Sequence, residues 1–194
     1  MAVEDFDAYN AYADEVGQNV WDVWADGFGG NGTGSTAGYL QEPFMSRGVV
    51  VGVGQALPLG YDNTGAFVDA QGSPASSTVS AISRAFVPPP DLTRDGATAV
   101  TLWVRGDQAN TAESADVLYM GIKDTAGQEA MVTVASADAL LKSYWQQKTI
   151  NLDALAGVDL TRVSEIVLGV GNPDAPQIGG SGIVLIDDIL LTAE

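Results

Sequence analysis

The chain has 194 residues, 46% of them hydrophobic, a formal net charge of −17, and neither Cys nor His. This length is typical of one globular domain, and the negative charge disfavours nucleic acid and anionic membranes as partners. Without Cys and His there is no disulfide, thiolate nucleophile, Ser-His-Asp triad or common zinc site, so an enzyme would need carboxylates, Tyr, Lys or a hard metal ion.

The first 47 residues have a loop-like pattern that contains several aromatic side chains. Trp21 and Trp24 are spaced to share one face of a short helical turn, and their flanking valines favour packing in the core. A glycine-rich run follows at 27–36. It lacks the Lys and the strand-to-helix context of a phosphate-binding loop, so it does not indicate nucleotide binding.

From residue 48 onward, short runs rich in Val, Ile and Thr alternate with Gly, Pro and Asp turn signals. A spacing of roughly ten residues predicts an all-β, jelly-roll β-sandwich of two antiparallel sheets, formed as a single module over residues 1–194. Brief helices are expected at 136–142 and 152–157. The expected strands are 48–53, 55–61, 66–69, 77–87, 97–105, 116–123, 128–134, 144–151, 162–170 and 182–192.

Alternation within the strands separates their two faces. In 97–105, three apolar residues at alternate positions predict a core face and leave Trp103 and Arg105 on the other face. In 116–123, the same pattern leaves Tyr119 and a Lys on the non-core face. Because a sheet face that meets only solvent rarely needs a Trp, the pattern indicates a ligand-binding face formed by adjacent strands.

The two ends of the chain, Glu4-Asp5-Phe6-Asp7 and Ile186-Asp187-Asp188-Ile189, resemble the first and last strands of jelly-roll carbohydrate-binding modules. The loop 24–35 resembles a subgroup found as non-catalytic modules in large secreted bacterial proteins. Internal segments that are similar in order and spacing are 55–63, 100–106 and 145–152. The resemblance implies a galactose-binding-like sandwich, polysaccharide binding without catalysis, and tethering to other domains of an extracellular or cell-surface protein.

The resemblance also implies a structural Ca²⁺ that bridges the two ends of the chain, with Asp5, Asp7, Asp187 and Asp188 as candidate ligands. Paired carboxylates in a final strand cost free energy unless they are solvated or neutralised, and a cation would neutralise them and pin both termini. Two other interpretations of the acidity remain: a solvated strand end, and a charge that keeps the protein soluble in salty water.

Sugar-binding proteins stack aromatic rings on pyranose rings and bind the hydroxyls with polar groups. Because a surface of −17 repels polyuronates and sulfated chains, the predicted partner is a neutral polysaccharide. The candidate stacking residues are Trp103 and Tyr119 by strand alternation, and Trp21, Trp24, Tyr39 and Tyr61 by loop position. The candidate hydrogen-bonding residues are Arg84, Arg105, Asp62 and Asn63.

Two alternative functions stay open from the sequence. One is a glycoside hydrolase or polysaccharide lyase on the same fold, with carboxylates such as Asp62, Asp69 or Asp116, although their spacing marks no acid/base pair. The other is a calcium-stabilised adhesion module that binds another protein. The N-terminus has no signal-peptide pattern and no apolar run of about 18 residues is present, so the chain is either cytoplasmic or part of a longer secreted precursor.

Overall fold

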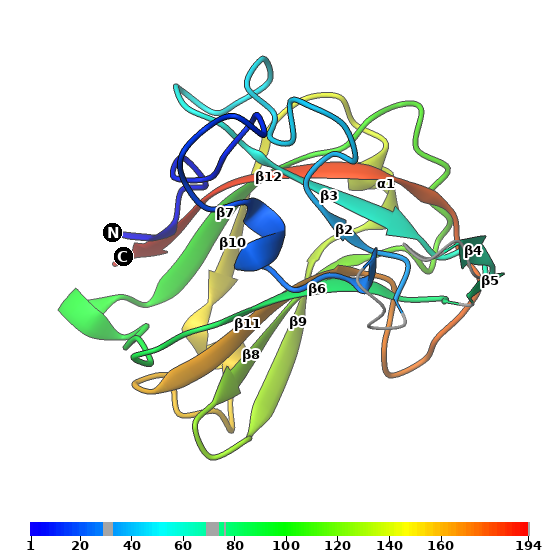
Figure 1. The fold of residues 1–194 in the computed structure, drawn as a ribbon. Helices are drawn as coiled ribbons and strands as arrows, with labels where there is room; N and C mark the ends of the chain where they lie inside the picture. The colour runs from blue at the N-terminus through cyan, green and yellow to red at the C-terminus, as the bar shows by residue number, and fades with distance from the viewer. Residues whose placement is uncertain (29–32, 69–73, 76, 194) are drawn as a thin grey trace.

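The structure, a computed structural model, describes residues 1–28, 33–68, 74–75 and 77–193. Two antiparallel sheets pack face to face (Figure 1). This confirms the predicted all-β sandwich. The larger sheet contains β1 (Ala2–Glu4), β2 (Thr36–Ala37), β3 (Leu57–Asp62), β7 (Ala99–Arg105), β10 (Gln146–Asn151) and β12 (Ser181–Thr192). The smaller sheet contains β6 (Ser80–Ala85), β8 (Leu118–Asp124), β9 (Glu129–Ala135) and β11 (Val163–Val170).

The strand order is β10-β7-β12-β3-β2 in the larger sheet, with β1 paired to β12, and β6-β11-β8-β9 in the smaller sheet. A separate ribbon pairs β4 (Phe67–Val68) with β5 (Pro74–Ala75). Helical structure is short, and no helix among the described residues has the length and hydropathy to cross a bilayer. The helical segments are η1 (Val20–Asp22), η3 (Arg94–Gly96), α1 (Ala137–Leu140) and η4 (Leu152–Leu155).

The core lies between the two sheets and is built by the alternation visible in the sequence. Every second residue of β7 and β8 points inward, where burial of an aliphatic side chain contributes about 1.5–3 kcal/mol. These side chains, each at most 2% exposed, are Val100, Leu102, Val104, Leu118, Met120 and Ile122. The predicted core faces of both strands are therefore confirmed.

The predicted strand at 48–53 is wrong, because this segment is a loop. Gly52 and Gly54 have φ values of 76° and 102°, which are incompatible with an extended strand. A Cβ on Gly54 would also lie 1.9 Å from Oδ1 of Asp7, so the chain can pass the N-terminal segment here only as glycine. The Val51 N–H donates to the side chain of Asp187 instead of to a neighbouring strand.

Strands β1 and β2 lie in the region that the sequence marked as loop. Ala2 and Glu4 pair with the last strand, and Thr36 and Ala37 pair with β3. With three and two residues, β1 and β2 are too short to show alternation, and each pairs with a strand that is distant along the chain. Local patterning therefore does not detect them.

Trp21 and Trp24 do not share a face. The helical turn η1 ends at Asp22, and the Trp24 N–H still donates to the Val20 carbonyl at 2.8 Å. Trp24 is fully buried, with its ring centroid 6.0 Å from that of Phe6, whereas Trp21 is 39% exposed. The expectation of core packing is thus confirmed for Trp24 and wrong for Trp21.

A buried polar network fastens one end of the sandwich. The Nδ2 group of Asn63, which is fully buried, donates to Oδ1 of Asp116 at 2.8 Å and to the Val170 carbonyl at 3.0 Å. Its Oδ1 accepts from Ser80 Oγ at 2.8 Å, and Asp116 accepts from the Gly180 N–H at 2.7 Å. The network joins the ends of β3, β6 and β11 to the segments that precede β8 and β12.

Replacing Asn63 by Ala should lower the free energy of unfolding by about 1–3 kcal/mol, because the buried acceptors and donors that it serves would lose their partners. Urea denaturation monitored by tryptophan fluorescence measures this loss. Asn151→Ala is the matched control, since Asn151 is exposed and its side chain makes no capping hydrogen bond to η4. Equal midpoints for the two variants would show that the network contributes no stability.

Candidate functional site

Trp103 and Tyr119 lie on opposite outer faces of the sandwich, so the predicted shared binding face is wrong. Trp103 is in β7 of the larger sheet, whereas Tyr119 is in β8 of the smaller one. The chain crosses from one sheet to the other between these strands. Alternation correctly gives the outward direction of each side chain, but it cannot tell which sheet a strand joins. Arg105 lies half-buried on the same outer face as Trp103.

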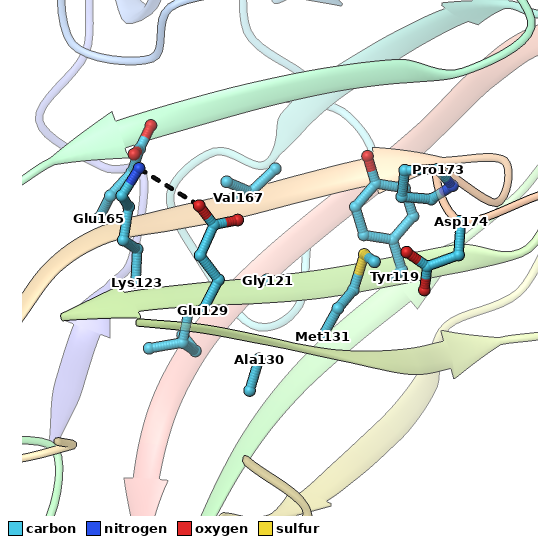
Figure 2. A pocket seen from close by; sticks show the side chains of 11 residues that line it. Tyr119, Gly121, Lys123, Glu129, Ala130, Met131, Glu165, Val167, Pro173 and Asp174 are labelled. Carbon is cyan, nitrogen blue, oxygen red and sulfur yellow. Dashed lines mark ion pairs between the residues drawn. The ribbon is translucent and has the colours of Figure 1, made fainter. Parts of the chain in front are cut away.

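A groove of about 490 Å³ runs over the outer face of the smaller sheet (Figure 2). At one end, Nζ of Lys123 pairs with Oε1 of Glu129 at 3.3 Å beside Glu165. At the other end lie Tyr119 and Asp174. Charged side chains thus lie at both ends of the groove, and Gly121, Met131 and Val167 line it between them.

Tyr119 is too deeply covered to serve as a stacking platform. It is only 5% exposed, and a Cβ on Gly169 of the neighbouring strand would lie 2.4 Å from its Cζ atom. The ring therefore lies against the sheet backbone, in space that only glycine leaves open. Burial raises the pKa of the Tyr119 phenol to about 12.

A second depression, of about 410 Å³, lies among the loops of the N-terminal segment and is lined by exposed aromatic side chains. We call it the aromatic cleft. Trp21 and Phe28 are 39% and 40% exposed, and Tyr39 is half-buried. The Trp21 ring meets that of Phe44 edge-to-face, with centroids 4.9 Å apart. Its lining residues are Trp21, Asp26, Phe28, Thr36, Ala37, Gly38, Tyr39, Leu40 and Phe44.

Backbone hydrogen bonds fix a carboxylate in the aromatic cleft. Oδ1 of Asp26 accepts from the Phe28 N–H at 3.1 Å, and Oδ2 accepts from the Ala37 N–H at 2.8 Å. The Gly27 N–H donates to Oγ of Ser35 at 2.8 Å, and that hydroxyl donates to a carbonyl of β6. These bonds attach the loop to the sandwich and give Asp26 a defined orientation beside the aromatic rings.

The loop returns to the cleft through a glycine that no other residue can replace without strain. Gly38 has a φ of 90°, and a Cβ there would lie 2.9 Å from Cγ1 of Val20 and 3.0 Å from the Phe44 carbonyl oxygen. The Tyr39 N–H donates to that same carbonyl at 2.8 Å and closes the turn. Tyr39 is thereby held at the rim of the cleft.

Three other predicted sugar-binding residues point into the protein. Trp24 and Tyr61 are at most 3% exposed and belong to the core, and burial raises the pKa of the Tyr61 phenol. Arg84 lies on the inward face of β6 and pairs with Glu4, which is 8% exposed. Each follows the inward alternation of its strand or packs under a loop, and none of the three lines the aromatic cleft.

The sequence analysis missed Phe28, Phe44 and Asp26 as residues of the candidate site. They lie in loops, where no periodic pattern predicts the direction of a side chain. The available signal was the density of aromatic residues on both sides of the glycine-rich run, which is high for a segment without strands.

The predicted meeting of the two chain ends is confirmed, because β1 pairs with β12 through Ala2–Leu190 and Glu4–Ile189. This pairing brings together a terminal acidic cluster, which consists of Asp5, Asp7, Asp187 and Asp188. Burial, with the nearby charges of Asp188 and Asp7, raises the pKa of Asp187 to about 6. Burial and the charges of Asp7 and Asp5 likewise raise the pKa of Asp188.

The negative charge of the cluster suits a hard cation, but the positions of its carboxylates, all among the described residues, do not by themselves form a metal site. None of the ion pairs within the described residues involves its four carboxylates. Three of them accept hydrogen bonds from backbone N–H groups: Asp187 from Val51 at 2.9 Å, Asp7 from Gln55 at 2.9 Å, and Asp5 from Asp7 at 3.2 Å. Across the described part of the chain, however, no three acidic side chains are arranged around a common metal position.

Asp62 and Asp116, the two described residues among the carboxylates considered for an enzyme, are each engaged in local hydrogen bonds. Asp116 is 1% exposed and belongs to the buried network with Asn63, and Oδ1 of Asp62 accepts from the N–H and hydroxyl of Thr64. Asp69 lies outside the described residues. Asp62 and Asp116 are therefore explained by local structure.

The sequence matches no protein-family model and no curated protein. Among solved structures, the chain is similar to a carbohydrate-binding module specific for non-crystalline cellulose, with 15% identity, a TM-score of 0.50 and 88% of each chain covered. A second such module, from the β-sandwich superfamily, gives 11% identity and a TM-score of 0.50, with 95% of this chain and 61% of that one covered. The fold is that of a jelly-roll carbohydrate-binding module.

The chain is also similar to one part of a larger enzyme chain. All of it aligns with an exo-β-agarase at 11% identity and a TM-score of 0.61, but it spans only 25% of that chain. At this level of identity the similarity establishes the fold alone.

Because the Tyr119 phenol is buried, we expect the folded protein to lose stability at alkaline pH. Because its pKa is about 12 in the folded protein and 10.0 as an ordinary phenol, the unfolded chain ionises first, and the folded state loses stability as the pH rises through this interval. Between about pH 9 and about pH 11, the melting temperature should fall less in Tyr119→Phe than in the wild type. Tyr144→Phe, at an exposed position, is the control. An unchanged slope in Tyr119→Phe would contradict the burial of this phenol.

Proposed function

We propose that the module binds a polysaccharide through the aromatic cleft and does not transform it. The observation that carries this proposal is the gathering of exposed aromatic rings around a depression of about 410 Å³, beside an Asp held by two backbone N–H groups. Rings of this kind pack on the apolar faces of sugars, and a fixed carboxylate accepts hydrogen bonds from hydroxyls. Trp21 and Tyr39 would stack on the sugar, and Asp26 would orient it.

The proposed ligand is a neutral glycan. The described residues that line the cleft include Asp26 but neither Lys nor Arg. An anionic chain would therefore meet a like charge within the site as well as the overall charge of −17. Trp103 and Arg105, on the outer face of the larger sheet, remain predicted contacts, and a Trp103 variant below tests that face.

We further propose that the module is tethered to other domains of an extracellular or cell-surface protein. The agarase to which it is similar is about four times longer, and another similar chain joins a carbohydrate-binding module to a catalytic module of a xylanase. A tethered module raises the local concentration of its companion domains at the polysaccharide surface, so weak binding by a single cleft is enough to keep those domains near the polysaccharide.

Affinity electrophoresis on agarose, xylan, mixed-linked β-glucan and non-crystalline cellulose tests the proposed site. Trp21→Ala and Tyr39→Ala should each weaken binding by about 1–3 kcal/mol, the range measured for bases stacked on aromatic side chains. This corresponds to a loss of about fivefold to about 140-fold in affinity.

Tyr144→Ala is the control for the loss of an exposed aromatic ring, because Tyr144 is 59% exposed and lies outside the cleft. Trp103→Ala tests the other face. If Trp103→Ala loses binding while Trp21→Ala and Tyr39→Ala retain it, the site lies on the larger sheet. If the wild type is retarded by none of the glycans, the adhesion alternative is favoured, and release of reducing sugar would instead reveal an enzyme.

We also propose that the terminal acidic cluster takes up one structural Ca²⁺. The support is electrostatic: among the described residues these four carboxylates take part in no ion pair, and burial together with the charges of neighbouring members raises the pKa values of Asp187 and Asp188. Oxygen ligands are those that Ca²⁺ prefers, and carbonyls can complete a set in which only some ligands are carboxylates. The ion would neutralise the cluster and join β1 to β12.

The melting temperature should rise with free Ca²⁺ and fall in excess chelator, since a ligand that binds only the folded state stabilises it, by about 2.7 kcal/mol at a concentration of 100 times Kd. Asp188→Asn should reduce this response, whereas Asp138→Asn, at an exposed position in α1, should preserve it. Identical melting curves of the wild type in chelator and in Ca²⁺ would refute the proposed ion.

A further inference from the structure

The aromatic cleft does not end at Tyr39. A second depression, of about 330 Å³, shares Thr36, Gly38, Tyr39 and Leu40 with it, so the two are continuous. The second depression extends over the edge of the larger sheet, across β2, β3 and β12. Its further lining residues are Gly34, Gly60, Tyr61, Asp62, Gly182 and Ile183.

In the floor of this second depression, the side chain of Thr36 lies over the backbone of Gly60. Gly60 takes the outward position in β3, because Leu59 and Tyr61 on either side of it are buried in the core. It pairs with Thr36 on one side and with Ile183 on the other. A Cβ on Gly60 would lie 2.2 Å from Oγ1 of Thr36, so the lack of a side chain there lets Thr36 lie close to the β3 backbone. Leu40 and Ile183, which line the same depression, are 66% and 39% exposed.

Hydrogen bonds hold this surface in place without a ligand. The first residues of β12 extend beyond the end of β7, and there the side chain of Asn110 pairs with β12 in place of a strand. It donates to the Ile183 carbonyl and accepts from the Ile183 N–H, each at 2.9 Å. At the far end, Thr64 holds the Asp62 carboxylate. A preformed surface loses less conformational entropy on binding than one that must first become ordered.

We infer that the module binds the interior of an extended polysaccharide chain, with one stretch against Trp21 and Tyr39 and the next over Gly60 between Leu40 and Ile183. This inference rests on the proposed function of the aromatic cleft. Each depression alone lies near the lower end of the usual range for ligand pockets, about 300–1,000 Å³, so a ligand that occupies both is elongated. The depressions are open along the surface, and a chain can therefore continue beyond either one.

The test is isothermal titration calorimetry with oligosaccharides of two to six sugar units, prepared from the glycan that retards the wild type most. The affinity of the wild type should rise by at least about tenfold along this series, as the longer chains reach the second depression. Ile183→Arg places a long side chain over the Gly60 floor and should abolish the rise, while leaving the affinity for the shortest oligosaccharide unchanged. Val87→Arg, at a position 97% exposed and outside both depressions, should behave as the wild type.

A wild-type affinity that is level along the series, or a rise that persists in a folded Ile183→Arg variant, would overturn the inference. In either case a loss of binding in Trp21→Ala would still support the aromatic cleft, so the proposed function would stand without the extension. If Trp21→Ala and Tyr39→Ala bind as the wild type does, or if no glycan binds, the proposed function fails and the inference fails with it. Urea midpoints of the variants establish that each is folded.

Discussion

The pairing of the last strand with three others is the constraint on which the rest of the structure depends. Strand β12 pairs with β3 along its first half, with β7 across its middle and end, and with β1 near its end. All three pairings join residues that are far apart in the chain, so their loop-closure entropy must be offset by the burial of Val184, Ile186 and Ile189 between the sheets. In Figure 1 this strand crosses the sandwich beside the N-terminal segment.

This one strand also separates the two proposed sites. Its first residues, with Ile183, form part of the glycan surface, while Asp187 and Asp188 lie beyond, in the terminal acidic cluster. A register shift between Asp187 and Leu190, where Asp188 has a φ of 48°, interrupts the regular ladder with β7. This irregularity places two adjacent carboxylates near the N-terminal segment. In a regular strand only one of them could lie there, because successive side chains point to opposite faces.

The loops, and not the outer faces of the sheets, supply the aromatic side chains of the proposed binding site. The outer face of the smaller sheet has a groove, but Tyr119, the aromatic residue among its described lining, occupies the space above Gly169 and is only 5% exposed. The exposed aromatic rings are instead supplied by η1 and the segments around β2, which are attached to the sandwich by Ser35 and Gly38. A rigid two-sheet scaffold with binding residues on its loops permits changes of ligand without changes in the core.

The sequence by itself determined the fold class, the core faces of β7 and β8, and the meeting of the two acidic chain ends, because alternation and turn signals are local and the ends are recognisable motifs. It also marked Trp21 and Tyr39 as candidates. Only the tertiary structure decided that Trp103 and Tyr119 lie on opposite faces, that Arg84 turns inward to Glu4, and that Phe28 and Asp26 join Trp21 in one cleft. Period-two alternation gives the direction of a side chain relative to its own strand, whereas sheet membership and loop conformation depend on contacts between residues that are distant in the chain.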